Sequence, residues 1–332
     1  MKPLTLETLD WTALDRLRAT FLAAQPGSGS YWNSISDVAN YDFTFAQRIG
    51  WKWDAVLREL KLRGWSPPPG ALLDWGCGSG VASRRVLEAF PPPPGTMLHL
   101  SDQSSLAVQF AADSARTAFP EIIVETGPMP ERVGTLVVSH VLNELDEAGG
   151  RALRAAIDRA DSILWVEPGT FADSRSLIQM REALRGEFRV VAPCTHQGAC
   201  GMLLAQNERH WCHHFAEPPA GIMADSDWVR FAQRAGVDLR SLPYSFLVLE
   251  RHMSRQPVEA ASTDGWSRII GEPRIYKGYA RLLCCQEGGV GDLDMQKRDA
   301  PQLYKAMKSG RSPMLIAGER NEHRFQSVTG SI

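Results

Sequence analysis

A short glycine-rich segment is the first place where residue types and their spacing could support chemistry. Residues 74–80 read Asp-Trp-Gly-Cys-Gly-Ser-Gly; they follow the apolar run 71–73 and precede a helical pattern that begins at Val81. Glycines let the backbone turn tightly and approach a ligand closely, while the first turn of a helix presents unpaired N–H groups. The segment therefore predicts a small-molecule binding loop between a buried strand and a helix.

The spacing of the glycines, together with a later acid, favours one class of ligand. Gly76, Gly78 and Gly80 occupy alternate positions, whereas the dinucleotide fingerprint is G-x-G-x-x-G. The pattern resembles the acid-led G-x-G-x-G loop of methyltransferases that use S-adenosylmethionine. Asp102 closes the next predicted strand, where a carboxylate can accept hydrogen bonds from both ribose hydroxyls. We expect Asp74 to orient the loop and face the methionine end of the ligand; the alternative is a plain strand-to-helix turn.

A group of cysteines is the second candidate site. Cys194, Cys200 and Cys212 are separated by five and eleven residues. Four thiolates suit either a tetrahedral zinc ion or a [4Fe–4S] cluster, so a fourth ligand must come from elsewhere in the chain. Cys284 and Cys285 lie in a predicted strand, where neighbours point to opposite faces, so only one of them can join the other three. The alternative is a set of buried free cysteines.

A catalytic residue is harder to assign. After the fourth predicted strand, residues 139–144 read Ser-His-Val-Leu-Asn-Glu. They lack the Asn/Asp-Pro-Pro-Tyr tetrapeptide that is typical of methylation at the amino groups of bases, and they contain no cysteine for methylation at a pyrimidine carbon. His140 and Glu144 could act as a base near the cofactor, while capping of the next turn by Asn143 and Glu144 is the alternative. Glu167 ends the fifth predicted strand at the same ligand-facing edge.

The elements that must position these residues form an alternating series. Short apolar runs predict strands, and segments with helical spacing separate them: strands at 71–75, 97–101, 122–124, 135–139 and 163–166, and helices at 81–90, 106–119, 149–160 and 174–184. Strands that alternate with helices predict an α/β fold with a doubly wound, Rossmann-like parallel sheet. The run 71–75 has no polar alternation, which is typical of a strand buried on both faces.

Helical segments precede this series, and a β-rich part follows it. Residues 4–24 and 34–63 read as amphipathic helices; in the first, Leu14, Leu17, Phe21 and Leu22 recur at helical spacing. A further helix is predicted at 226–236 and strands at 244–250 and 279–285. We therefore predict four parts: an N-terminal helical region (1–66), a core that binds S-adenosylmethionine (67–190), a Cys-rich metal-binding segment with a small β module (191–310), and a loosely ordered tail (311–332).

Composition sets limits on partners and compartment. The 332 residues have a net charge of −2, and the absence of any apolar run of about 18 residues predicts no membrane span. The first 15 residues lack the layout of a secretory signal, and their acids argue against a transit peptide, so we expect the cytoplasm. Residues 251–332 hold 13 Lys and Arg against 9 Asp and Glu. This balance permits contact with RNA through Arg268, Arg274, Lys277 and Arg281, or is an ordinary solvated surface.

An ordered series of motifs resembles one protein family. The motifs are the segments 139–145, 165–170, 192–196, 211–213 and 268–285. Together they resemble the ribosomal small-subunit methyltransferase-like family, the "Rsm twenty-two" group of bacteria and mitochondria. The resemblance runs from about residue 30 to about residue 310. Two positions depart from the family pattern: Gly201 stands where a proline usually follows the second cysteine, and His214 is an extra residue before Phe215.

The resemblance implies a function and a metal centre. It implies a role at the small ribosomal subunit, either as a methyltransferase acting on rRNA or a ribosomal protein in translation, or as a non-catalytic assembly factor that retains the cofactor fold. A methyltransferase for a small molecule is a third hypothesis that the ordered motifs disfavour. The resemblance also implies a [4Fe–4S] cluster, with zinc as the alternative, held by Cys194, Cys200, Cys212 and Cys285. The oligomeric state stays open.

Overall fold

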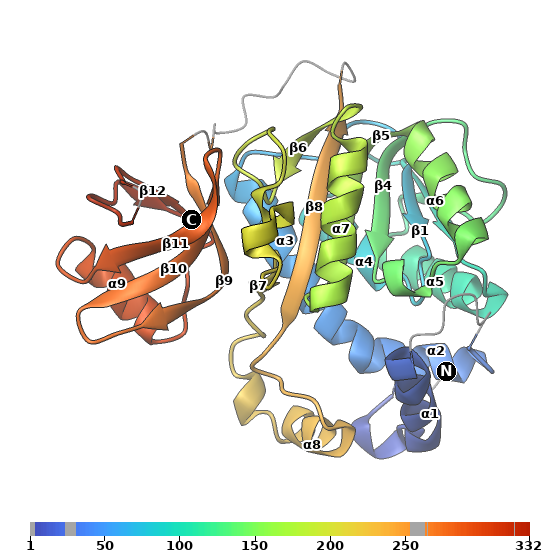
Figure 1. The fold of residues 1–332 in the computed structure, drawn as a ribbon. Helices are drawn as coiled ribbons and strands as arrows, with labels where there is room; N and C mark the ends of the chain where they lie inside the picture. Colours follow the sequence, from blue (N-terminus) through green and yellow to red (C-terminus); the bar gives the residue numbers. More distant parts are fainter. Residues whose placement is uncertain (1–3, 24–30, 253–262, 264, 322) are drawn as a thin grey trace. The chain divides into compact units, whose positions relative to one another are not determined.

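The computed structural model describes residues 4–23, 31–252, 263, 265–321 and 323–332 (Figure 1). The chain divides into two compact units that interleave along the sequence, whereas the sequence predicts consecutive segments. Unit 1 comprises the residues up to Arg58, then Ser66–Glu167 and Ala216–Leu242. Unit 2 comprises Glu59–Trp65, Pro168–Phe215 and the residues from Pro243 on. Among the described residues, no helix combines the length and apolar character needed to span a bilayer.

Unit 1 begins with helices, as predicted: η1 (Leu6–Thr8), α1 (Trp11–Ala23), α2 (Ile35–Phe43) and α3 (Phe45–Leu62). The single helix expected over 34–63 is interrupted at Thr44, whose hydroxyl donates to the Asn40 carbonyl at 2.6 Å. Such a side-chain bond competes with the helical backbone. Leu14 and Leu17 are buried as expected, but Leu22 is 73% exposed, so its assignment to the buried face was wrong. Leu14 packs against Phe231 of α8 (Ser226–Ala235), which follows η5 (Ile222–Ala224).

The sheet of unit 1 confirms the predicted parallel α/β architecture. Its strands are β1 (Leu72–Trp75), β2 (Met97–Ser101), β3 (Ile123–Glu125), β4 (Val133–Ser139) and β5 (Ala160–Pro168). They run parallel in the order β3-β2-β1-β4-β5. The connections contain α4 (Val81–Ala89), α5 (Ser105–Ala118), η2 (Leu142–Glu144) and α6 (Glu147–Arg159). The order reverses between β1 and β4, and ligands of such sheets bind outside the carboxyl ends of the strands at this switch point.

Unit 2 contains a helix and a small antiparallel group of strands that surround the Cys-rich segment. These elements are α7 (Phe171–Leu184), β6 (Phe188–Ala192), η3 (Gly201–Leu203), η4 (Ala205–Asn207), β7 (His214–Phe215) and β8 (Pro243–Arg251). Strands β6 and β7 both pair with β8, with Val190 opposite Leu249 and His214 opposite Tyr244. The strand predicted at 244–250 is therefore confirmed as β8.

The remainder of unit 2 is a five-stranded antiparallel sheet that closes on itself. Its elements are β9 (Ser267–Ile275), β10 (Tyr279–Gln286), β11 (Gly289–Gln296), α9 (Pro301–Lys308), β12 (Leu315–Ala317) and β13 (Gly330–Ser331), in the strand order β11-β10-β9-β12-β13. The segment before β13 bonds to β11, because Asp294 N donates to His323 O at 2.9 Å and Phe325 N donates to Asp294 O at 3.0 Å. The sheet is thus a small barrel, with α9 beside it (Figure 1).

The barrel has its own apolar core and includes residues that the sequence assigns to a loose tail. Leu282, Met295, Ile316 and Phe325 are fully or almost fully buried in that core, and α9 adds Tyr304. The prediction of a loosely ordered tail from residue 311 is therefore wrong for the segment that contains β12 and Phe325. Strands of two or three residues are too short to show the alternation by which a sequence reveals a strand.

Candidate cofactor site and cysteine cluster

The glycine loop lies at the carboxyl end of β1, and its backbone requires glycine. Gly76, Gly78 and Gly80 all have positive φ, at 69°, 51° and 77°, a conformation that side chains disfavour. A Cβ atom at Gly76 would lie 2.8 Å from the Val141 side chain, and one at Gly80 would lie 2.9 Å from that of Ala111. At Gly78, no described residue other than its two chain neighbours has an atom within 4 Å of the corresponding position. The loop is thus packed at both ends and open at its centre.

The two predicted carboxylates bond to the loop and to the helix that follows it. Asp102 accepts hydrogen bonds from Gly78 N at 2.9 Å and from Ser104 N at 2.8 Å. Asp74 is fully buried and accepts from Ser83 N of α4 at 3.3 Å through Oδ2, while its Oδ1 has no partner among the described residues. Burial raises the pKa of both groups, and that of Asp74 rises to about 7. The structure therefore brings the predicted residues together at one sheet edge.

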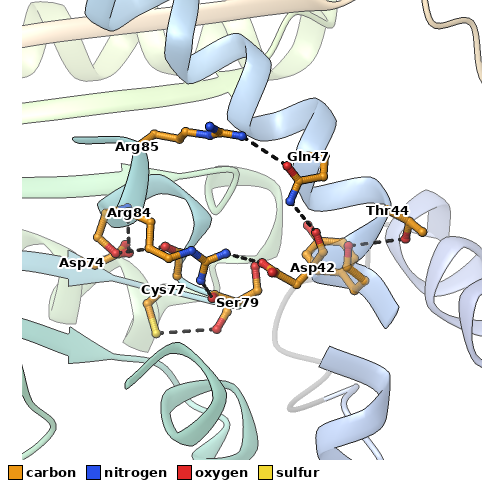
Figure 2. A network of polar contacts seen from close by, with 12 residues as sticks. Asp42, Thr44, Gln47, Asp74, Cys77, Ser79, Arg84 and Arg85 are labelled. Carbon is orange, nitrogen blue, oxygen red and sulfur yellow. Dashed lines mark hydrogen bonds and ion pairs between the residues drawn. The ribbon is translucent and has the colours of Figure 1, made fainter. Parts of the chain in front are cut away.

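An arginine that the sequence analysis missed fixes the loop to the N-terminal helices. Arg84 of α4 donates to the Ser79 carbonyl at 2.6 Å and to the Asp42 carboxylate of α2 at 2.5 Å (Figure 2). Gln47 donates to the Asp42 carbonyl at 2.8 Å and accepts from Arg85 at 3.2 Å (Figure 2). The N-terminal helices thus help to set the position of the loop, and no motif marks them for this role.

His140 follows β4 at the same edge and is held in a sparsely populated backbone conformation. It has a φ of 57° and is the only described non-glycine residue with a positive φ. Its Nδ1 lies 3.3 Å from Ser139 Oγ and its Nε2 lies 3.3 Å from Lys52 Nζ. Burial and the Lys52 charge hold the pKa of His140 well below its usual range. Because an ammonium group can only donate a hydrogen bond, the lone pair of His140 Nε2 faces the Lys52 ammonium group as its donor.

Glu144 lies on η2 beside Asp102 and Tyr31. The Tyr31 hydroxyl lies close enough that the charge of Glu144 helps to raise the pKa of Tyr31, after the larger effect of burial. Burial, and secondly the charge of Asp102, raise the pKa of Glu144 to about 7. Glu167 accepts from Val141 N at 3.2 Å and from Trp165 Nε1 at 2.7 Å, which fixes the start of the segment that carries Glu144. Glu144 is therefore placed to exchange a proton near neutral pH.

In unit 2, four of the cysteines gather in one partly buried region, which we call the cysteine pocket. Cys200, Cys212 and Cys285 belong to one apolar cluster with Ile178, Met202 and Ile270. Cys194 is close enough that its charge raises the pKa of each of the other three, after the larger effect of burial. Cys285 Sγ lies 3.6 Å from His196 Nε2. Cys284 instead lies in the barrel core, so the two neighbours in β10 do point to opposite sides.

The sequence predicts a metal site at these thiols. In the described part of the chain, no three His, Cys, Asp or Glu side chains are arranged to hold a metal ion. The structure therefore shows no preformed ligand set in its described residues, either for zinc or for a cluster. Cys77, in the glycine loop, is a buried free cysteine outside this group.

Buried cations surround the cysteine pocket. Arg268 of β9 is 1% exposed; it pairs with the buried Glu59 at 2.6 Å and lies near Cys212. Arg63 pairs with the same carboxylate at 2.7 Å. Arg181 of α7 is 2% exposed and lies near Cys194. Two guanidinium groups thus share one carboxylate in a pocket lined by thiols.

Several buried polar atoms in this pocket have no hydrogen-bond partner among the described residues. They are the donors Arg181 Nε, Arg268 Nε and Arg268 Nη2, and the ring nitrogen His196 Nδ1. A buried donor without an acceptor is costly, and uncompensated buried charge is costlier still. The pocket therefore fits an anionic group that carries hydrogen-bond acceptors of its own, such as a thiolate-bound cluster with inorganic sulfide.

The expected role of the C-terminal cations needs correction. Arg268 is buried against Glu59 and cannot reach a ligand at the surface. Arg274 is paired with Asp292, and Arg281 donates to Asp294 at 2.7 Å. These residues contribute to the positive balance of residues 251–332, but ion pairs across β9, β10 and β11 neutralise the charges of Arg274 and Arg281. Of the four predicted cations, burial excludes Arg268, whereas Arg274, Lys277 and Arg281 stay candidates for RNA contact because exposed ion pairs are weak.

The fold and the two sites define the class: an α/β protein with the parallel sheet and acid-led glycine loop of the methyltransferase type, joined to a closed β barrel. The sequence profile of the family described as mitochondrial small ribosomal subunit Rsm22 matches residues 47–311. This match covers most of the chain, and the protein belongs to that family. The family resemblance found in the sequence is thereby confirmed.

Comparison with solved structures shows distant similarities in fold. No curated protein matches the sequence. The magnesium protoporphyrin IX methyltransferase of Synechocystis PCC 6803, solved with bound S-adenosylmethionine, is 14% identical; the alignment covers 76% of this chain and 100% of that one, with a TM-score of 0.40. The plantazolicin methyltransferase BamL is 12% identical, with 73% and 97% covered and a TM-score of 0.39. Similarity at this level does not by itself define a ligand.

Proposed function

We propose that the chain binds S-adenosylmethionine at the glycine loop and acts at the small ribosomal subunit as a methyltransferase of rRNA or of a ribosomal protein. One observation carries the cofactor assignment: Gly78 is open at the centre of a loop whose ends are packed, and Asp102 accepts from its N–H. The adenosyl ribose would lie against Asp102, and the charged methionine end would lie toward Asp74. Family membership supports the ribosomal context.

Calorimetry with S-adenosylmethionine tests the cofactor site. Gly78→Val should abolish binding, because a branched side chain would fill the open centre and strain the positive φ. Gly95→Val is the matched control, since Gly95 also has a positive φ and open space but precedes β2 at the opposite end of that strand. Asp102→Ala should weaken binding by about tenfold or more, the effect of losing a charged hydrogen bond. Equal affinity in Gly78→Val and the wild type would refute the assignment.

Transfer of the methyl group distinguishes this proposal from the non-catalytic alternative, an assembly factor. The lone pair of His140 Nε2 faces Lys52, which disfavours His140 as the base, whereas Glu144, whose pKa rises to about 7, stays the candidate base. Small subunits from cells that lack the protein, incubated with it and with labelled S-adenosylmethionine, distinguish the two. Label in rRNA or ribosomal protein that Glu144→Gln abolishes supports the enzyme. Binding of the cofactor and the subunit without label supports an assembly factor.

We also propose that Cys194, Cys200, Cys212 and Cys285 hold a [4Fe–4S] cluster. Three of the thiols belong to one cluster of side chains and Cys194 lies near them, and a four-iron cube binds four thiolates, one at each iron corner. The buried cations and the unpartnered N–H groups of Arg181 and Arg268 fit the negative charge and the sulfide acceptors of such a cluster. When bound, the cluster would supply a rigid link between the loops and β10.

Purification under anaerobic conditions tests the cluster. The protein should be brown, with iron and sulfide in about equal amounts. Cys285→Ser should lose both, because it removes a ligand. Cys284→Ala is the matched control, since this neighbour lies in the barrel core; alanine is used there because a serine hydroxyl would be buried without an assured partner. A stoichiometric amount of zinc without iron or sulfide would show that the site binds zinc and not a [4Fe–4S] cluster.

A further inference from the structure

The connectivity of the C-terminal barrel corresponds to a known binding scaffold. Three antiparallel strands follow one another, and β12 returns to pair with the first of them, β9. The last strand region pairs with β12 through β13 and, around Arg324, runs parallel to β11. This closed five-stranded arrangement is that of the OB-fold, in which the loop between the first two strands and the loop between the last two border the ligand. Because a fold alone does not establish a ligand, the ligand class must be inferred from the side chains at these loops.

A stacked pair of tyrosines stands at the loop between the first two strands. The rings of Tyr276 and Tyr279 are nearly parallel, 4.6 Å apart at an interplanar angle of 11°. Tyr276 is 42% exposed although it is a large aromatic residue. The Arg281 guanidinium lies over the Tyr279 ring at 5.7 Å. The loop conformation is fixed, because Tyr276 N donates to Tyr279 O at 2.9 Å and the Tyr304 hydroxyl donates to the Tyr276 carbonyl.

A basic hollow adjoins this loop. It has a volume of about 480 Å³ and is lined by Gly278, Gln296, Lys297, Arg298, Pro301 and Arg324. Lys297 N donates to Gly278 O at 2.9 Å, which ties the tyrosine loop to the end of β11. Arg298 and Arg324 both approach one carboxylate, that of Asp299, at 3.6 and 3.4 Å. Among the described residues, the lining therefore carries three cations and no acid, and two of these cations share the neighbouring carboxylate of Asp299.

We propose that this face of the barrel is a binding site for unpaired nucleotides of RNA. A base stacks on the Tyr276 ring, and the adjoining phosphates lie at Lys297, Arg298 and Arg324. Aromatic rings recognise bases that are splayed out of a duplex, and a basic groove follows the backbone of a single strand. The choice of RNA over DNA rests on the proposed function at the small ribosomal subunit. Neither the glycine loop nor the cysteine pocket is part of this site.

Fluorescence anisotropy of a labelled 12-nucleotide single-stranded RNA, with the full-length protein, tests the site. Tyr276→Ala should weaken binding by at least about fivefold, the lower end of what one stacked base contributes. Tyr276→Phe should retain wild-type affinity because the ring remains. Phe171→Ala is a matched control for an exposed aromatic residue in the same unit but outside the barrel, and it should leave the affinity unchanged.

Salt dependence tests the phosphate contacts. Lys297→Ala/Arg298→Ala should reduce the slope of log affinity against log salt by about 0.7 per lost contact. Lys305→Ala/Lys308→Ala removes the same number of charges from the end of α9 and should leave the slope unchanged.

Three outcomes would overturn the site. They are no binding by the wild type, unchanged affinity of Tyr276→Ala, or equal slopes for the two double variants. Equal affinity for DNA of the same sequence would overturn the assignment to RNA. Co-sedimentation of the wild type with small subunits in the absence of oligonucleotide binding would refute this site while leaving the proposed function standing.

Discussion

At the scale of single residues, burial dominates the chemistry of the candidate cofactor site. Asp74 and Glu144 are carboxylic acids whose pKa values rise to about 7, mainly because burial disfavours the charged form. Both lie at the edge where a cofactor with a positively charged sulfonium would bind. Without a bound cation these acids would therefore be partly protonated near neutral pH, and a cationic ligand would favour their ionised forms.

This leads to a prediction about stability and pH. The pKa of each acid is higher in the folded than in the unfolded protein, so the folded form binds more protons between about pH 4 and pH 7. Stability without ligand should fall as the pH rises through this range and change little above about pH 8 from these groups. Asp74→Asn removes the contribution of Asp74 to this pH dependence. The free energy of unfolding of the variant minus that of the wild type should therefore increase with pH, by up to a few kcal/mol at pH 8.

Urea unfolding at pH 5 and pH 8 measures the effect. Asp113→Asn, at an exposed position of α5, is the control and should show no such increase. The same difference between Asp74→Asn and wild type at both pH values would mean that Asp74 does not carry the pH dependence.

At the scale of elements, the sequence predicted the strands and helices that follow a periodic pattern. It did not predict very short strands or contacts between segments that are far apart in the chain. The parallel strands and helices between residues 71 and 184 were predictable because buried strands and amphipathic helices follow periodic patterns. The glycine loop and Asp102 were predictable because their spacing is part of the chemistry. The contacts of Tyr31 with Glu144 and of Arg84 with Asp42 were not, since they join segments far apart in sequence. The short strands β12 and β13 gave no periodic signal.

The departure at Gly201 has a structural explanation in the packing of η3 against β11. A Cβ at this position would lie 3.1 Å from Gly289 Cα and 3.1 Å from Val290 N. These are backbone atoms of a strand start, which cannot move as a flexible side chain can. Glycine at 201 therefore allows a close approach that the proline usual in the family would obstruct here.

Gly201→Ala should accordingly destabilise the protein by about 1–3 kcal/mol, the usual cost of overpacking. Gly288→Ala, next to the same contact but with open space around its Cβ position, is the matched control. Chemical denaturation followed by fluorescence gives both values. A loss no larger than that of Gly288→Ala would mean that η3 and β11 are not in close contact.

At the scale of the whole molecule, the two proposed cofactor sites belong to different units. Every residue of the glycine loop site lies in unit 1, and every residue of the cysteine pocket lies in unit 2. A cluster that ties Cys212 to Cys285 would close a chain segment of more than 70 residues. Such a closure stabilises the folded state, because the ligands are brought together only there.

Removal of iron should therefore lower the melting temperature of the protein while leaving its affinity for S-adenosylmethionine unchanged within error. Anaerobic protein before and after chelation, followed by calorimetry with and without the cofactor, gives both quantities. The control is Cys285→Ser, which should match the chelated wild type without any further effect of the chelator. An affinity that falls together with the iron content would show that the two sites are coupled.

The interleaving of the two units has a consequence for synthesis of the protein. A nascent chain emerges from its amino terminus, and unit 1 is complete only when Leu242 has appeared, after much of unit 2 has already been made. Unit 2 is completed later than unit 1, because its barrel closes only when β12 and β13 have been synthesised. A premature stop shortly before residue 315 would thus release a chain with all three segments of unit 1 but an open barrel. Its unpaired strand edge would be exposed to aggregation.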